Sequence, residues 1–125
     1  MAAQFFYDSY AVLAFTSGNQ AYKPYFTEHN GVLTKLNLLE IYSRCLVEYN
    51  AKVATSIAEA FSKYVIDFGL RDIAGAMNLR LNLKRKGRDI SYADAVGYYL
   101  SAKLGAKFLT GDQAFRDLTG VEFVE

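Results

Sequence analysis

Phe5-Phe6-Tyr7-Asp8, near the start of the chain, is the stretch of sequence that decides the fold. Its aromatic residues predict a short buried strand over residues 4–7, and the apolar run after it predicts a helix that begins near Tyr10 and ends near Gly18. A strand that leads at once into a helix is typical of an α/β sheet. Ligands of open sheets bind beyond the carboxyl ends of the strands, so Asp8 is the first candidate site residue.

The rest of the chain alternates apolar runs of helix and strand length. Asn37 and Ser91 are the expected N-caps of two long helices, and Gly105 is the expected end of the second. Helices over 51–67 and 71–86 are separated by a short break, so we expect them to form an antiparallel helical-hairpin arm. The alternation predicts an α/β fold in three layers, with a mainly parallel twisted sheet flanked by helices. The other expected elements are helices over 21–29, 37–50, 92–104 and 112–118 and strands over 32–36, 106–109 and 121–124.

Composition bounds the class of protein. A chain of 125 residues fits one domain, residues 1–125, and apolar residues at 52% with charged residues at 22% argue against intrinsic disorder. The formal net charge of +1 creates no strong overall field, so binding to nucleic acid would depend on local patches. The apolar run before Asp8 is too short for a signal peptide or a membrane span, which makes the cytoplasm the expected location.

Two single residues limit the chemistry. Cys45 is the one cysteine and lies in the apolar pattern of its helix, so we expect a small core residue. His29 is the one histidine, and its place beside Asn30 and Gly31 predicts a surface or capping residue. The sequence therefore gives little support to a catalytic triad built on a serine or cysteine nucleophile.

Three further acids share the position of Asp8, at the end of a predicted strand or the start of a predicted helix: Glu40, Asp94 and Asp112. Four carboxylates gathered at one edge would raise each other's pKa unless a cation neutralised them, and such oxygen ligands favour Mg²⁺ or Mn²⁺. Each of the three also has a structural interpretation. Glu40 and Asp94 stand at capping-box spacing from Asn37 and Ser91, and Asp112 could be an N-cap.

Four motifs bring a known family into view: Phe6-Tyr7-Asp8-Ser9, Leu39-Glu40-Ile41-Tyr42, Ile90-Ser91-Tyr92-Ala93-Asp94-Ala95 and Leu109-Thr110-Gly111-Asp112-Gln113-Ala114-Phe115. In this order they make nearly the whole chain resemble the PIN-domain ribonucleases, and more narrowly the VapC-type toxins of toxin–antitoxin pairs. The chain departs from the toxins' pattern at Tyr10, where many members carry a small polar residue or asparagine. That departure bears on the fine geometry around Asp8.

The resemblance implies a metal-dependent endoribonuclease. Asp8, Glu40, Asp94 and Asp112 would bind Mg²⁺ or Mn²⁺, and Ser9 and Thr110 would hold the carboxylates by hydrogen bonds. It further implies a homodimer and a cognate antitoxin bound across the active-site groove. A cation in such a cluster turns water into a nucleophile and offsets the charge that grows on a phosphodiester, so no protein nucleophile is required.

An RNA substrate also needs positive charge near the acids. The run Lys84, Arg85, Lys86 and Arg88 is the expected RNA-binding patch, joined by Lys103, Lys107 and Arg116, although cations also favour the end of any solvated helix.

Other classes stay in view. A catalytically silent PIN-like module that binds protein or RNA is the alternative, and lone PIN domains also serve in RNA processing. A haloacid-dehalogenase phosphatase would have an aspartate where Tyr10 stands, a receiver domain would have paired acids on the first strand, and the sequence contains no glycine-rich phosphate loop.

Overall fold

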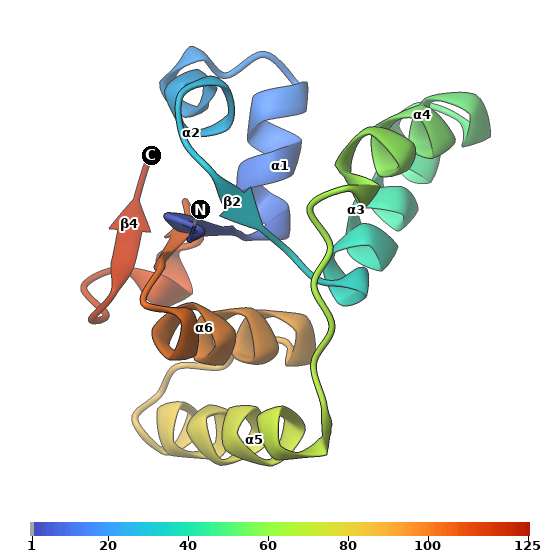
Figure 1. Ribbon diagram of the computed structural model, residues 1–125. Coiled ribbons are helices and arrows are strands. Elements are labelled where there is room, and N and C mark those ends of the chain that lie inside the picture. Colours follow the sequence, from blue (N-terminus) through green and yellow to red (C-terminus); the bar gives the residue numbers. More distant parts are fainter. Residues whose placement is uncertain (1) are drawn as a thin grey trace.

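Four short parallel strands form the centre of the protein in the computed structural model, which describes residues 2–125 (Figure 1). The order across the sheet is β2-β1-β3-β4, so the first and third strands lie side by side in the middle. The prediction of a parallel α/β sheet is confirmed. The bounds are β1 Phe5–Tyr7, β2 Gly31–Val32, β3 Lys107–Thr110 and β4 Val121–Phe123.

Helices cover both faces of the sheet. In Figure 1, α1 and α2 lie above the strands, α6 lies below them, and α5 lies beneath α6. The pair α3 and α4 projects to the upper right as a hairpin. The bounds are α1 Ser9–Thr16, η1 Gln20–Tyr22, α2 Lys23–Thr27, α3 Lys35–Glu48, α4 Ala51–Ser62, α5 Leu70–Arg85 and α6 Tyr92–Leu104, with the short turn η2 at Gln113–Phe115.

The arm is built from a different pair of helices than the sequence suggested. The prediction that residues 51–67 and 71–86 pair was wrong, because α4 packs on α3 and α5 packs on α6. The helix predicted to reach residue 67 ends at Ser62, and the chain after it joins the sheet side of the molecule. There Leu33 donates its N–H to the carbonyl of Tyr64 at 3.1 Å and accepts the N–H of Ile66 at 2.9 Å. This pairing separates α4 from α5.

The start of α3 also differs from the prediction. The strand expected over 32–36 ends at Val32, and the helix begins at Lys35 with Thr34 as its N-cap. Asn37 is the third residue of the helix, and its Oδ1 accepts the Thr34 N–H at 3.0 Å. Threonine and asparagine at this spacing form a capping box, so Asn37 does belong to a cap but is not the N-cap itself.

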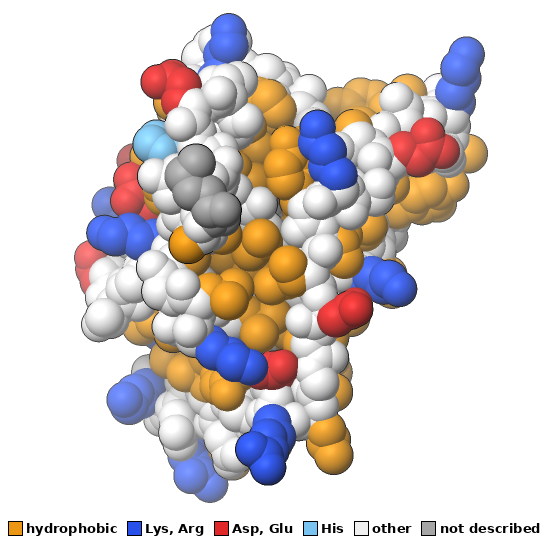
Figure 2. Space-filling view, in the orientation of Figure 1, with side chains coloured by type: hydrophobic (Ala, Val, Ile, Leu, Met, Phe, Trp, Pro, Cys, Tyr) orange, Lys and Arg blue, Asp and Glu red, His pale blue; other side chains and the backbone are white. Residues whose placement is uncertain are grey.

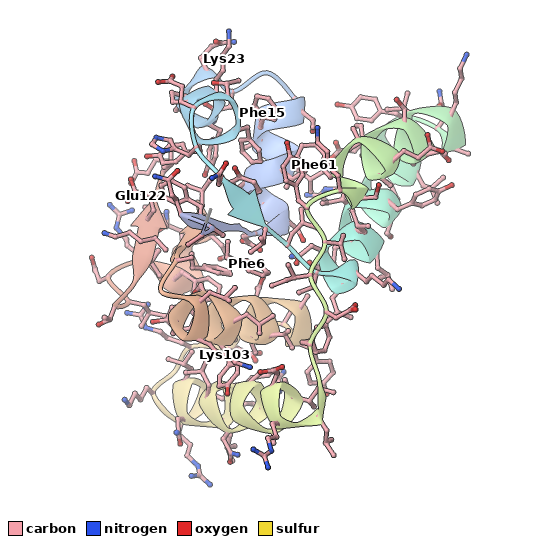
Figure 3. The ribbon with its side chains drawn as sticks, viewed as in Figure 1. Phe6, Phe15, Lys23, Phe61, Lys103 and Glu122 are labelled. Atoms are coloured by element: carbon pink, nitrogen blue, oxygen red, sulfur yellow. The ribbon has the colours of Figure 1, made fainter. Side chains whose placement is uncertain are left out.

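Aromatic side chains fill the core. Phe6 of β1 and Phe108 of β3 are fully buried and stack with ring centres 5.8 Å apart. Helix α6 approaches them closely because it carries Gly97 there, where a Cβ atom would lie 2.5 Å from the Phe6 ring. Figure 3 marks Phe6 beneath the sheet and shows Phe61 of α4 pointing toward the α1 and α2 side of the molecule. Phe61 meets Phe26 of α2 edge-on at 5.9 Å, which ties the hairpin to the body.

The two single residues are placed as the sequence predicted. Cys45 is buried in α3, and burial raises the pKa of its thiol. His29 is exposed, and its Nδ1 lies 3.2 Å from the Gln4 Oε1. Within residues 2–125 we find no helix with the length and apolar character that crossing a bilayer would require. Figure 2 shows charged side chains mainly around the margin of the face in view, with apolar side chains in its middle.

Candidate active site

The site begins where β1 and β3 end together. Tyr7 is paired with Leu109 across the two strands, so the next residues along the chain, Asp8 and Thr110, meet at one edge of the sheet. Asp8 is only 2% exposed, and the Thr110 Oγ1 donates to its Oδ2 at 2.6 Å. The same hydroxyl oxygen accepts the Asp112 N–H at 3.0 Å. Thr110 therefore fixes the Asp8 carboxyl group and the turn that carries Asp112.

Helix α6 brings a second carboxyl group against the first. Asp94 lies in its first turn, where its N–H donates to the N-cap Ser91 Oγ at 3.1 Å as the sequence predicted. The carboxyl groups of Asp8 and Asp94 lie close enough for each to affect the pKa of the other. Burial raises the pKa of Asp8 well above its ordinary value, and the charge of Asp94 raises it further. Burial likewise raises the pKa of Asp94, with a contribution from Asp112.

Glu40 reaches the site from the second turn of α3. The prediction that it forms a capping box with Asn37 was wrong, because the helix starts earlier and Glu40 faces Ser9 instead. The Ser9 Oγ donates to the Glu40 Oε1 at 2.6 Å. Burial raises the pKa of Glu40, the Ser9 hydrogen bond partly offsets this, and the Asp94 charge adds to it.

Asn37 is the functional residue that sequence reasoning missed. It is fully buried, its Nδ2 donates to the Ser9 Oγ at 3.0 Å, and its Oδ1 accepts the Thr34 hydroxyl at 3.0 Å. The signal that could have revealed it is the spacing of Thr34 and Asn37, which is that of a capping box placed directly after a strand. Asn37 thus orients Ser9, and Ser9 orients Glu40.

Asp112 has a capping role, as the sequence predicted. Its Oδ1 accepts the Ala114 N–H at 3.0 Å and caps η2. The helix expected over 112–118 was wrong, because only residues 113–115 form a helical turn. The Asp112 carboxylate still lies near enough to Asp94 to raise the pKa of that group.

The four acids lie close enough for their charges to interact, but they do not form a complete set of ligands around one point. Across residues 2–125, no group of three or more His, Cys, Asp or Glu side chains is arranged so that it could hold a metal ion. Glu40 is drawn to Ser9 and Asp112 to Ala114, so both carboxylates would have to turn toward Asp8 and Asp94 to share one ion. None of the ion pairs in this part of the chain involves these acids. Asp8 is buried, the pKa values of Asp8, Glu40 and Asp94 are raised, and carboxylate ligands of this kind without a basic partner are a donor set that fits a hard divalent cation.

The predicted RNA-binding residues divide into two groups. Lys84, Arg85 and Lys86 are exposed at the end of α5. Arg88 instead donates to the carbonyl oxygens of Ala114 at 3.0 Å and Arg116 at 2.6 Å, so we assign it to the fold.

The three additional cations lie apart from that run. Lys103 pairs with Asp72 at 2.7 Å, and Lys107 begins β3 at the edge of the sheet opposite to the acids. Arg116 pairs with Glu125 at 2.6 Å.

Tyr10 lies at the mouth of a groove between α1 and α3. The residue is 45% exposed, and its ring abuts Gly111, where no larger side chain would fit. Two adjoining cavities of about 320 and 400 Å³ follow the groove. Tyr10 lines the first and Glu40 lines the second, while Leu13 and Arg44 line both. The groove is thus continuous with the acidic site.

Comparison with known proteins finds relatives at the level of structure only. No protein-family model matches the chain, and no curated protein does so. A chain in the DNA-bound VapBC structure from Salmonella typhimurium superposes with a TM-score of 0.76 at 14% identity, over 98% of this chain and 97% of that one. A toxin–antitoxin complex from Klebsiella pneumoniae gives 0.73 at 16% identity, over 95% and 96%. VapBC2 from Rickettsia felis, bound to a promoter DNA fragment, gives 0.72 at 15% identity, over 96% of each chain.

These superpositions cover nearly the whole of both chains, and the expected fold is therefore confirmed. The chain has the α/β fold found in VapBC toxin–antitoxin complexes, in agreement with the resemblance to VapC-type PIN domains that its motifs carry.

Proposed function

We propose that this protein is a metal-dependent endoribonuclease that hydrolyses RNA phosphodiester bonds, and that it is the toxin of a type II toxin–antitoxin system. The observation that carries the proposal is the buried carboxyl group of Asp8, at the carboxyl end of β1, with the partly buried Asp94 of α6 beside it. Glu40 and Asp112 lie beside this pair. Catalytic groups of α/β folds occupy this edge of the sheet.

The chain's own residues would work by holding oxygen ligands in place. Asp8, Glu40, Asp94 and Asp112 would bind Mg²⁺ or Mn²⁺, a role that needs these carboxyl groups to be ionised. Thr110 orients Asp8, and Ser9 orients Glu40, through the hydrogen bonds described above. When bound, a divalent cation supplies a more acidic water and offsets the negative charge of the reacting phosphate.

The substrate would approach from the exposed end of α5. Lys84, Arg85 and Lys86 supply positive charge for RNA phosphates, whose contacts position the strand without reading its sequence. If these residues bind phosphates, cleavage by the triple Lys84→Ala, Arg85→Ala, Lys86→Ala variant becomes less sensitive to salt than cleavage by the wild-type protein.

The test of the nuclease is cleavage of a labelled RNA with Mg²⁺ or Mn²⁺, with chelator, and with Asp94→Asn purified in the same way. We expect cleavage only with the cation and only by the wild-type protein. Equal cleavage by the variant would reveal a contaminating ribonuclease. No cleavage of several RNAs by either protein would favour the alternative, a catalytically silent PIN-like binding module.

An antitoxin partner is the second part of the proposal. The structural neighbours are toxin–antitoxin complexes, and the groove between α1 and α3 leads directly to Glu40. Exposed Leu39 and Val47 on α3 add apolar surface near it. An antitoxin segment in this groove would cover the acids and block cleavage.

This part is tested by adding the product of a small adjacent gene to the cleavage reaction. Inhibition that is lost in Leu13→Arg supports the antitoxin site, whereas an active nuclease without such an inhibitor points to RNA processing. The homodimer is part of the same proposal and is measured by light scattering.

A further inference from the structure

A tyrosine and an arginine form a stacked pair beside the acidic site. Tyr92 is the first residue of α6 and is 65% exposed. The guanidinium carbon of Arg80, from α5, lies 4.5 Å from the centre of the Tyr92 ring. An aromatic ring this exposed contributes little to the core, and its stacking with Arg80 is the contact that holds it in place.

Arg80 is fixed in this position by the segment that precedes α6. Its Nε donates to the carbonyl oxygen of Ile90 at 2.8 Å, and its Nη2 lies 3.8 Å from the Asp89 Oδ1. The Arg80 side chain is only 25% exposed. The guanidinium therefore stays on one face of the Tyr92 ring, and the exposure of the residue leaves the rest of the ring open to solvent.

The pair joins α5, which carries the exposed cations at its end, to α6, which carries Asp94 in its first turn. Tyr92 precedes Asp94 by two residues in the same helical turn, which is about 3 Å along the helix axis. Lys84 follows Arg80 by four residues on α5, so the two side chains share one face of that helix. A nucleic acid strand that reaches from Lys84 to Asp94 would pass the Tyr92 ring.

We propose that Tyr92, backed by Arg80, is a stacking platform for an unpaired base next to the phosphodiester that the acids act on. The platform rests on the proposed function and names the side chain that would contact a base beside the bond that is cleaved. Aromatic faces bind unstacked bases of any sequence, and a duplex offers no such base. The cation on the far face keeps the ring oriented before RNA arrives. Tyr92 would position the substrate rather than take part in the reaction.

The experiment measures binding without cleavage. Fluorescence anisotropy measures how tightly the Asp94→Asn variant, in the presence of chelator, binds a labelled single-stranded RNA. The same measurement is made with copies of this RNA that each lack one base. We expect one abasic position to weaken binding about tenfold, since stacking of one base on an aromatic side chain is worth roughly that factor or more. In Asp94→Asn with Tyr92→Ala, intact RNA should bind about tenfold more weakly, and the abasic position should have no further effect.

Two matched variants serve as controls. Tyr92→Phe keeps the ring and should bind like its parent. Tyr49→Ala removes a tyrosine that is 54% exposed at the end of α3 and should leave the abasic profile unchanged. Thermal melts of each variant show that the fold is retained.

The outcomes separate the platform from the nuclease. If one missing base weakens binding only when Tyr92 is present, and the wild-type protein cleaves no RNA, the platform is supported and the proposed nuclease activity is contradicted. Cleavage together with a flat abasic profile, or with no measurable RNA binding, overturns the platform and keeps the nuclease. A flat profile in which Tyr92→Ala changes only the oligomeric state or antitoxin binding also overturns it and makes Tyr92 a protein contact.

Discussion

Asp8 is the residue for which ionisation in the folded protein is least favourable. It is a buried carboxyl group that faces a second one, and the ion pairs of residues 2–125 give it no basic partner. Burying an unpaired charge is expensive, so burial raises the pKa of the Asp8 carboxyl group. The folded chain therefore binds more protons than the unfolded chain over the range of pH between the two pKa values of this group.

The first prediction concerns the pH dependence of stability. Because folding raises the pKa values of Asp8 and Asp94, the free energy of unfolding falls as the pH rises above about 4, the ordinary pKa of an aspartate. Asp8→Asn imitates the protonated group, since an amide can accept from Thr110 and donate to Asp94. Without divalent cations its melting temperature should exceed that of the wild type by several degrees at pH 8, with a smaller gap at pH 5. A gap that widens toward low pH would contradict this account.

The second prediction concerns Ser9. Its hydroxyl lowers the pKa of Glu40, so Ser9→Ala should raise that pKa further and leave Glu40 without an orienting partner. We expect kcat/KM to fall about tenfold, which is about 1.4 kcal/mol, with the rising limb of the pH profile displaced to higher pH. Ser17→Ala is the matched control, because that hydroxyl donates only to the Ala14 carbonyl at the exposed end of α1. Equal effects of the two substitutions would remove Ser9 from the site.

At the scale of elements, the sequence predicted most helices and all four strands. Ser91 and Gly105 bound α6 as expected, because a side-chain cap and a left-handed glycine are local signals that lie in the sequence itself. The partner of α4 was not predicted, because helix pairing depends on the route of the chain between helices. Here that route is set by hydrogen bonds from Leu33 to a distant segment.

The third prediction belongs to the start of α3. Asn37 is buried and joins the helix cap to Ser9, so Asn37→Ala removes the acceptor of the Thr34 N–H and hydroxyl and one of the two hydrogen bonds of Ser9. Urea unfolding should show a loss of about 2 kcal/mol, and cleavage should weaken as well. Asn50→Ala is the control, because Asn50 caps α4 by accepting the Val53 N–H at 2.9 Å on the surface. It should cost about 1 kcal/mol and leave cleavage unchanged.

At the scale of the whole molecule, folding brings together acids from four distant parts of the chain. Because their negative charges repel one another, the stability of the fold should depend on cations. Motif order placed Asp8, Glu40, Asp94 and Asp112 at one edge of the sheet. The Asp112 cap and a hydrogen bond from Ser9 to a carboxylate were both expected, but the sequence could not tell that Ser9 would bind Glu40 in particular, because that pairing depends on how α3 packs against α1.

The fourth prediction follows from this repulsion. Mg²⁺ or Mn²⁺ should raise the melting temperature, by an amount equivalent to about 2.7 kcal/mol at a concentration one hundred times the dissociation constant. Asp8→Asn and Asp94→Asn should largely lose the shift. Glu48→Gln should keep it, because Glu48 pairs with Arg44 on the exposed side of α3. An undiminished shift in both aspartate variants would place cation binding elsewhere.

Because Cys45 is buried, the reactivity of its thiol reports motions of the α3–α4 hairpin. It is the one thiol of the chain, and it is 1% exposed in the helix that carries Glu40. A thiol reagent can reach it only when α3 leaves the body, so the labelling rate of the native protein reports how often that hairpin opens. If a bound partner holds the groove beside α3 closed, Cys45 should be labelled more slowly, and the comparison needs no substitution or tag in the chain.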